Sequence, residues 1–324
     1  MNEPLLEVKD LVVEFPIGAD RVVHAVSGVS LSIFEGETLG LVGESGCGKS
    51  TTARAIMQLP PPTSGSVRLN NVELTDLSSE ALRQQRRNFQ MIFQDPISSL
   101  NPRRRVGDIV SMPLEVMREG NAAERMERAR RMLESVGLDP DIAMDRRPFQ
   151  FSGGQCQRIS IARALVVEPR MLICDEPVSA LDVSIQAQII NLLEEMKARY
   201  SLTMLFISHD LAVVKNVCDR VAVMYLGRVC ELTDSEDLYR APAHPYTAAL
   251  LSAIPEADPT RKPRPLAMKD GELPSPTNPP SGCRFRTRCP RADVVCERET
   301  PLLREVAPRH QVACHFPIWD GAPP

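Results

Sequence analysis

Residues 43–51 combine glycines, a lysine and hydroxyl side chains in a spacing that suits phosphate binding. They read Gly-Glu-Ser-Gly-Cys-Gly-Lys-Ser-Thr, after an apolar run and before a helical pattern. Glycines let such a loop wrap so that backbone N–H groups point inward, and the following helix adds its positive end. The pattern predicts that Lys49 reaches the β- and γ-phosphates of a nucleotide and that Ser50 binds Mg²⁺. The predicted contacts are Gly43, Ser45, Gly46, Cys47, Gly48, Lys49, Ser50 and Thr51.

A pair of carboxylates follows a second apolar run. Asp175 and Glu176 come directly after residues 171–174. At the end of a buried strand, Asp175 suits a Mg²⁺ partner and Glu176 suits a base that orients an attacking water. Acidic residues here could instead begin a helix, where carboxylates interact favourably with the helix dipole. Beside a phosphate loop, the metal and base roles are the stronger interpretation.

Three short apolar runs indicate the elements that must position these groups. Residues 38–42, 171–174 and 204–207 read as strands buried on both faces of a parallel sheet. Turn residues and a helical pattern follow each run. This alternation predicts an α/β domain.

The stretch from about 96 to 165 is different, because its apolar residues recur at helical spacing. Asn121 is the expected N-cap, with Glu124 three residues later as a capping box, and Gly137 closes the segment. Glu124 and Arg128 are four residues apart and are expected to pair. The pattern predicts a helical insertion into the α/β core.

The composition limits the kinds of partner. The 324 residues carry a net charge of −4, which does not indicate a nucleic-acid partner. No apolar stretch approaches the ~20 residues that span a bilayer, and the first residues lack a secretory signal. Five of the nine cysteines are scattered through regular-looking segments, which suits a reducing compartment. We therefore expect a cytoplasmic protein that docks on another chain if it serves a membrane process.

Five further motifs resemble those of ABC ATPases. Residues 151–155, Phe-Ser-Gly-Gly-Gln, are similar to the signature loop, with phenylalanine where leucine is usual. Gln94 matches the Q-loop, and residues 179–182 match the D-loop. His209 matches the switch histidine, and Phe15 aligns with the aromatic residue that stacks on adenine. Because these motifs, the phosphate loop and the carboxylates follow the family order, the chain resembles the ABC ATPase family.

The resemblance implies an α/β P-loop NTPase core with a parallel sheet, an antiparallel β subdomain and a helical insertion. It implies binding of ATP and Mg²⁺, with Glu176, His209 and Gln94 as the catalytic residues. The signature loop is expected to complete the ATP site of the opposite subunit in a head-to-tail dimer. The implied Mg²⁺ ligands are Ser50, Gln94 and Asp175. The further implied nucleotide contacts are Phe15, Gln94, Asp175, Ser152, Gly153, Gly154, Gln155 and Asp182.

Other features narrow the class within the family. Residues 52–150 are too few and too proline-punctuated for the long coiled coil of the DNA-repair members. The chain holds one cassette, whereas the translation factors hold two. Exporters usually fuse the ATPase to a membrane span, and the sequence shows none. A separate ATPase subunit of an importer fits best.

The C-terminal tail narrows the class further. Half of the prolines, 14 of 28, fall in residues 255–324, so the tail is neither a long helix nor a central strand. Residues 240–251, 271–276 and 283–290 resemble the C-terminal extension of oligopeptide and dipeptide importer ATPases. Residues 98–103 most resemble the second, "F-type", ATPase of such pairs.

This resemblance implies an ATPase domain at 1–240, with its helical subdomain at about 96–165, and an extension at 241–324. The implied partners are a paralogous "D-type" ATPase in a heterodimer, two permease subunits and, indirectly, an extracytoplasmic solute-binding protein. The implied location is the cytoplasmic face of the bacterial inner membrane. Nickel-chelate and glutathione importers share the extension, and a mainly nucleotide-binding, regulatory half of an asymmetric ATPase pair is a further alternative.

Four cysteines crowd into the tail, with five, six and seventeen residues between them. Four thiolates in a short proline-rich segment suit a tetrahedral zinc site or an iron–sulfur cluster. The lack of paired C-x₂-C motifs argues against an ordinary zinc ribbon, and the family resemblance favours a [4Fe–4S] cluster over zinc or unligated thiols. The predicted ligands are Cys283, Cys289, Cys296 and Cys314.

Overall fold

The computed structural model describes residues 3–18, 20–253, 268 and 272–318, and the chain folds into two compact units. The first unit is assembled from residues 1–33, 38–75 and 208–324, and the second from residues 34–37 and 76–207. Residues on both sides of the boundary predicted at 240 belong to the first unit, and the functional division there stays a prediction.

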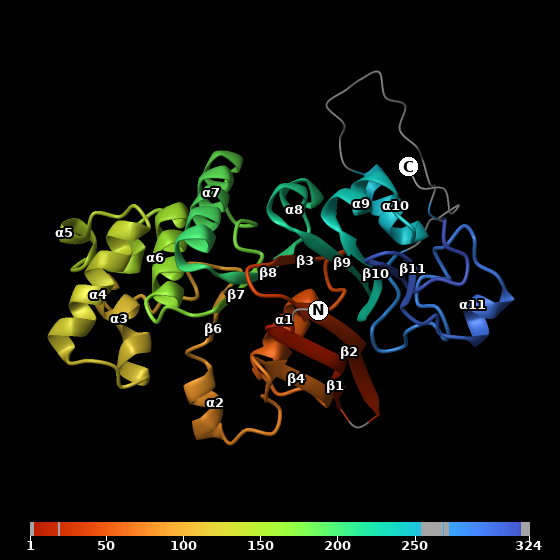
Figure 1. Cartoon of the computed structure of the whole chain (residues 1–324), viewed down its shortest axis with the longest axis horizontal. Coiled ribbons are helices and arrows are strands. Elements are labelled where there is room, and N and C mark those ends of the chain that lie inside the picture. Colours follow the sequence, from red (N-terminus) through yellow and green to blue (C-terminus); the bar gives the residue numbers. More distant parts are fainter. Residues whose placement is uncertain (1–2, 19, 254–267, 269–271, 319–324) are drawn as a thin grey trace. The chain divides into compact units, whose positions relative to one another are not determined.

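The first unit contains a four-stranded antiparallel sheet in the order β2-β1-β4-β5 (Figure 1). Residues of β1 alternate toward its core on each side of a register shift between Val8 and Leu11, since Leu6, Val8, Leu11 and Val13 are buried. This is the period of a strand with one covered face. The sheet is the antiparallel β subdomain that the family resemblance implies. Its strands are β1 (Leu6–Ile17), β2 (Arg21–Ile33), β4 (Ser64–Leu69) and β5 (Val72–Glu73).

A second group of strands in the first unit has the order β11-β12-β10-β9-β3. β3 (Thr38–Val42) is buried at all five residues and runs parallel to β9 (Arg220–Tyr225). The tail adds the last two strands, because β12 (His310–Val312) pairs with β10 (Arg228–Asp234) and β11 (Arg304–Ala307) pairs with β12. The helices of this unit are α1 (Lys49–Ile56), α8 (Leu211–Val217), α9 (Ser235–Arg240), α10 (Pro245–Ser252) and α11 (Val294–Arg298).

The second unit holds three parallel strands in the order β8-β7-β6. They are β6 (Phe89–Ile92), β7 (Met171–Asp175) and β8 (Thr203–Ser208). Every residue of β7 and β8 is buried, so these strands are covered on both faces, as their uninterrupted apolar sequence predicts. The predicted α/β class is confirmed.

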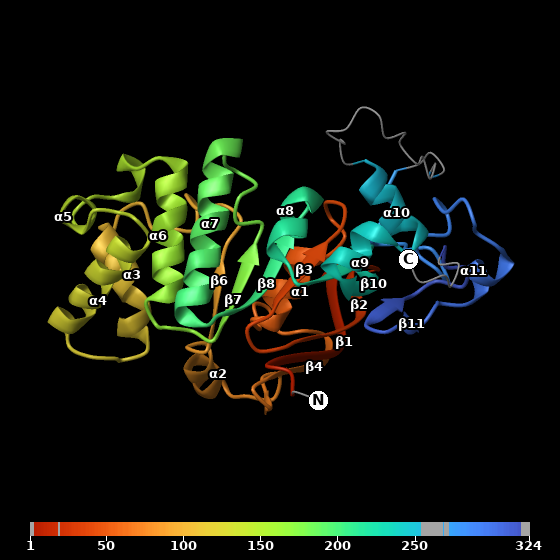
Figure 2. The same ribbon diagram turned by 45° about the horizontal axis from the view of Figure 1, so that its top comes forward.

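Helices make up the rest of the second unit, including the insertion predicted at about 96–165. α6 packs against α3 and α4 in this insertion (Figures 1 and 2). The predicted capping box is present at the start of α4, where Asn121 and Glu124 bond to each other's backbone N–H groups. The helices are α2 (Ser79–Gln85), α3 (Val106–Val116), α4 (Ala122–Ser135), α5 (Pro140–Ala143), the 3₁₀ turn η1 (Pro148–Gln150), α6 (Gly153–Leu165) and α7 (Val183–Tyr200).

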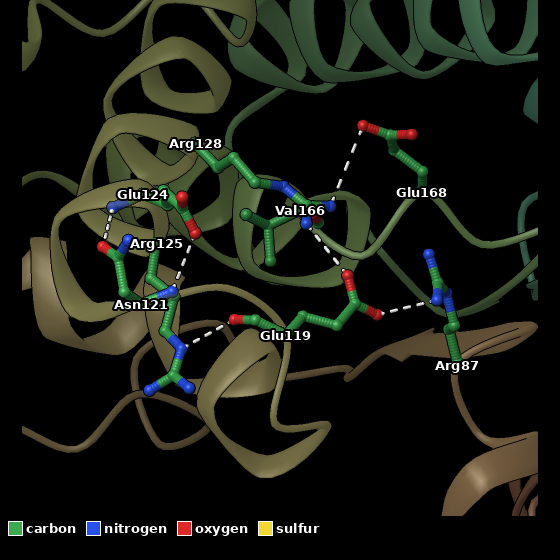
Figure 3. Close-up of polar contacts among 8 residues, drawn as sticks. All are labelled: Arg87, Glu119, Asn121, Glu124, Arg125, Arg128, Val166 and Glu168. Atoms are coloured by element: carbon green, nitrogen blue, oxygen red, sulfur yellow. Dashed lines mark hydrogen bonds and ion pairs between the residues drawn. The ribbon is translucent and has the colours of Figure 1, made fainter.

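The expected pairing of Glu124 with Arg128 is wrong, because both side chains are used elsewhere (Figure 3). Arg128 donates to the Glu119 carboxylate at 2.9 Å and to the Val166 carbonyl at 2.9 Å. Glu119 also pairs with Arg87 at 3.0 Å. The Glu124 side chain is held by the capping box. Its hydrogen bond to a nearby backbone N–H is favoured over an ion pair with Arg128, because exposed ion pairs contribute little to stability.

Candidate functional site

The phosphate loop, residues 43–51, leaves the buried end of β3 in a conformation that requires glycine at two points. Gly43 and Gly48 have φ angles of 151° and 105°. A Cβ atom would lie 2.1 Å from the Met224 carbonyl oxygen at Gly43 and 2.3 Å from the Ala25 carbonyl oxygen at Gly48. Both distances are impossible contacts, so any larger residue would push the loop away from the strands beneath it.

Lys49 is the first residue of α1, and its side chain folds back over the loop. Its Nζ donates to the carbonyl oxygens of Gly43 at 2.8 Å and Glu44 at 3.0 Å. The loop therefore gathers a cation and a helix N-terminus at one place, which is the arrangement that binds phosphate. Ser45 and Gly46 are exposed at its surface, whereas Cys47 is buried and burial raises the pKa of its thiol. The Cys47 thiol is therefore neutral rather than a thiolate.

The same unit holds two other predicted site residues. Phe15 lies on β1 opposite Val23 of β2 and is 38% exposed. His209 is exposed and directly precedes Asp210, whose carboxylate caps α8 by accepting from the N–H groups of Ala212 and Val213.

In the second unit, the predicted base and the Q-loop glutamine are in direct contact. Gln94 Nε2 donates to Glu176 Oε2 at 3.0 Å. Glu176 has a φ angle of 48°, a left-handed conformation that is uncommon outside glycine and asparagine and is often found at functional sites. Its backbone N–H donates to the Ile207 carbonyl at 3.1 Å, which fixes the turn after β7.

Asp175 is the last residue of β7 and is fully buried. A buried carboxylate is costly unless a cation or hydrogen bonds compensate its charge. The role of Asp175 as a Mg²⁺ partner stays a prediction.

The signature loop forms the N-terminus of α6. The Ser152 hydroxyl accepts from the Gln155 N–H at 3.3 Å, and the Gln155 side chain accepts from the Ser152 N–H at 3.0 Å. This capping box presents the first backbone N–H groups of the helix at an exposed end.

Packing explains the second glycine of the signature loop. A Cβ atom at Gly154 would lie 2.5 Å from Ile185 Cγ2, and one at Gly153 would lie 3.4 Å from Leu181 Cδ2. The D-loop and the start of α7 therefore lie directly against the signature loop. Asp182 caps α7 by accepting from the Ile185 N–H at 3.1 Å, and hydrogen bonds from Ser184 and Ile185 lower the pKa of its carboxyl.

The four tail cysteines lie within the first unit. Cys289 and Cys296 are buried, and the Cys283 N–H donates to the Cys296 carbonyl at 2.8 Å. Burial is the main cause that raises the pKa of Cys314 to about 12, and the charges of the other three tail cysteines act in the same direction. Among the described residues, however, no group of three or more His, Cys, Asp or Glu side chains is arranged to hold a metal ion.

The two histidines beside Cys314 have other partners. His310 is buried and pairs with Glu231 of β10 at 2.7 Å, and the His315 ring lies 3.0 Å from the Glu299 carbonyl.

The sequence did not predict the residues that bond to Glu44 of the phosphate loop. The Arg288 guanidinium pairs with the Glu44 carboxylate at 2.8 Å, and the Tyr246 hydroxyl accepts from the Glu44 N–H at 3.0 Å. The only local signal is an acidic residue inside a loop that must bind phosphate. Its partners come from parts of the chain about 200 residues or more away.

Comparison with known proteins agrees with this geometry. Residues 26–179 match the ABC transporter family model, and residues 230–296 match the model for the oligopeptide/dipeptide transporter C-terminal region. The chain is 51% identical over 320 residues to the oligopeptide transport ATP-binding protein OppF of Escherichia coli K12, covering 96% of this chain and 95% of that protein. It is 51% identical over 326 residues to the oligopeptide transport ATP-binding protein AppF of Bacillus subtilis 168, and the match covers 97% of this chain and 98% of that protein.

Solved structures share the fold of the cassette. The ATP-binding cassette MJ0796, in a dimeric post-hydrolysis state bound to ADP and Pi, is 31% identical with a TM-score of 0.65, covering 71% of this chain and 98% of that one. CbiO1 from Clostridium perfringens is 30% identical with a TM-score of 0.64, and the match covers 74% of this chain and 92% of that one. No helix among the described residues is long and apolar enough to span a membrane. The chain therefore belongs to the ABC transporter ATP-binding family and carries the C-terminal region of its oligopeptide/dipeptide branch.

Proposed function

We propose that this chain is the ATP-hydrolysing subunit that powers import of di- or oligopeptides through an ABC transporter. The observation that carries the proposal is the hydrogen bond from Gln94 to Glu176, which orients the expected base. The constrained phosphate loop supports ATP binding, and the tail that matches the oligopeptide/dipeptide region supports peptide as the cargo.

In the proposed reaction, Lys49 and the loop N–H groups bind the β- and γ-phosphates. Glu176 orients water for attack on the γ-phosphorus, Gln94 holds Glu176 in place, and His209 contacts the γ-phosphate. Phe15 stacks on the adenine. Ser50, Asp175 and Gln94 would hold Mg²⁺, which when bound neutralises phosphate charge.

The signature loop is proposed to act on the nucleotide of a second ATPase subunit. Its capped helix end and close packing against Leu181 and Ile185 make it a rigid donor of N–H groups. We propose a heterodimer of an F-type chain, this one, with a D-type paralogue. This pair would bind two permease subunits at the cytoplasmic face of the inner membrane, and an extracytoplasmic solute-binding protein would deliver the peptide.

The test is uptake and hydrolysis by the reconstituted complex. The Glu176→Gln variant should lower both peptide uptake and ATP turnover by about 10²-fold or more, because loss of a general base has an effect of this size. ATP binding should persist in this variant. Lys49→Ala should instead weaken ATP binding. Unchanged turnover in Glu176→Gln would assign this chain to the regulatory half of an asymmetric pair. Uptake of glutathione or a nickel chelate in place of peptide would reassign the cargo.

We also propose that the four tail cysteines bind a [4Fe–4S] cluster, with zinc as the alternative. The support is the residue type and its clustering in the sequence, because four cysteine thiolates from one short segment are the usual ligands of such a cluster. The cluster would stabilise a tail with few regular elements. Anaerobically purified protein should be brown and contain about four iron and four sulfide per chain. Colourless protein with one zinc per chain would replace the cluster by zinc, and metal-free protein would remove both.

A further inference from the structure

The tail, defined as residues 241–324, is bonded directly to the phosphate loop. Arg288, which stands between Cys283 and Cys289 of the tail, places Nη1 2.8 Å and 3.1 Å from the two carboxylate oxygens of Glu44. Glu44 is the second residue of the phosphate loop. Both residues belong to the first unit.

A second tail residue binds the backbone of the same loop residue. The Tyr246 hydroxyl, at the start of α10, accepts from the Glu44 N–H at 3.0 Å. Burial raises the pKa of Tyr246, so the phenol stays neutral. The Glu44 carbonyl, in turn, accepts from Lys49 Nζ at 3.0 Å. The N–H, carbonyl and carboxylate of Glu44 are therefore all engaged, and the chain of bonds ends on the phosphate-binding lysine.

The two tail residues are themselves rigidly supported. Tyr246 is fully buried, and Arg288 is 9% exposed. The Tyr246 ring packs against Tyr225 at 4.7 Å and Phe285 at 5.4 Å between centroids, and the Arg288 guanidinium lies 5.9 Å from the centre of the Tyr225 ring. Groups locked in this way can fix the geometry of what they bond.

The charge of Glu44 makes this support relevant to nucleotide binding. A carboxylate in a loop that binds a triphosphate repels the ligand, and the repulsion is strong where solvent is excluded. A guanidinium within hydrogen-bond distance cancels that charge. The hydrogen bond to Glu44 is also the main cause of the raised pKa of Arg288, so the arginine is permanently charged.

We propose that Arg288 and Tyr246 are positioning residues for ATP, through which the C-terminal tail neutralises Glu44 and preorganises the phosphate loop. The proposal rests on the proposed ATP-binding function of the loop. It assigns the tail a task in nucleotide binding, because without the tail the loop would carry an uncompensated negative charge. Neither residue touches the nucleotide in this scheme.

The test is equilibrium binding of a fluorescent ATP analogue with Mg²⁺ to the full chain. Arg288→Met should raise Kd on the order of tenfold, since a charge-assisted hydrogen bond contributes about that factor. The effect should be larger at low salt, because screening weakens the repulsion from Glu44. Arg288→Lys, which keeps the charge, should recover most of the affinity.

The decisive variant combines Arg288→Met with Glu44→Gln. Removing the carboxylate removes the repulsion, so the double variant should bind ATP within about threefold of Glu44→Gln alone, a strong departure from additivity. If Arg288 only stabilised the tail, its loss would weaken binding equally in both backgrounds.

Arg286→Met is the matched control. Arg286 lies two residues away in the same segment and bonds to Ser281 rather than to the phosphate loop. Its loss should leave Kd unchanged. Equal effects of Arg286→Met and Arg288→Met would overturn the positioning role, as would a normal Kd in Arg288→Met. Failure of the unaltered chain to bind ATP would instead overturn the proposed function.

Discussion

Gln94 and Glu176, 82 positions apart in the chain, meet at a distance of 3.0 Å between the amide nitrogen and a carboxylate oxygen. Gln94 follows β6 and Glu176 follows β7, and the two strands are parallel neighbours whose C-terminal ends lie at the same edge. The glutamine therefore holds the carboxylate from the adjacent strand.

The first prediction concerns this bond. Gln94→Ala should lower the kcat of ATP hydrolysis by about 10–100-fold, because a misplaced catalytic group loses orientation. The Kd for ATP should change much less than kcat. Gln90→Ala is the control, since Gln90 lies on β6 and bonds to the Arg86 carbonyl. A large loss of affinity with normal kcat would show that Gln94 does not position Glu176.

The second prediction concerns the signature loop. Gly154→Ala should destabilise the chain by about 1–3 kcal/mol, the usual cost of overpacking, because the new Cβ would meet Ile185 at 2.5 Å. Urea unfolding measures the change. Ile185→Ala in the same chain should remove the collision and make the two changes non-additive. Gly153→Ala, with a 3.4 Å contact, should cost less, and an equal cost would contradict the packing explanation.

The third prediction concerns the attachment of the tail. His310 of β12 pairs with Glu231 of β10, and both side chains are almost fully buried. His310→Ala should destabilise the chain by about 1–3 kcal/mol, because the buried Glu231 carboxylate loses its ring partner while the Ala243 and His244 N–H groups still donate to it. His315→Ala, at a more exposed histidine of the tail, should change the unfolding free energy by less than about 1 kcal/mol. Similar small changes in both variants would show that β12 adds little stability.

The fourth prediction concerns acid stability. Burial lowers the pKa of His244 to about 4 from the ordinary 6.5. The unfolded chain therefore takes up a proton between these values while the folded chain does not. The contribution of His244 to the free energy of unfolding is fully present above pH 6.5 and is lost as the pH falls toward 4. The loss is up to about 1.4 kcal/mol per pH unit.

The test compares the pH dependence of urea unfolding between the unaltered chain and His244→Asn. His244 caps α10 by accepting from the Tyr246 N–H at 3.0 Å, and asparagine preserves a cap without titrating. The variant should lose less stability between pH 7 and pH 5 than the unaltered chain. Identical slopes would show that His244 does not drive the acid response.

Much of the site could be predicted because its motifs are local. The phosphate loop is nine consecutive residues, and its glycines adopt backbone conformations that other residues rarely adopt. The capping boxes at Ser152 and Asn121 depend on residues that are three positions apart. The strands at 38–42, 171–174 and 204–207 lie where uninterrupted apolar runs indicate them. The pairing of Glu124 with Arg128 failed, because helical spacing does not reveal the competing partner Glu119.

The sequence by itself determined the family, the α/β class and the residues of each motif, since these depend on residue type and short spacing. Only the tertiary structure decided that Arg288 and Tyr246 hold Glu44, and that β12 pairs with β10. Glu44 and Arg288 are 244 positions apart. Contacts at such separation follow from how the whole chain packs, and no local pattern of charge or hydrophobicity encodes which distant arginine an acidic residue will meet.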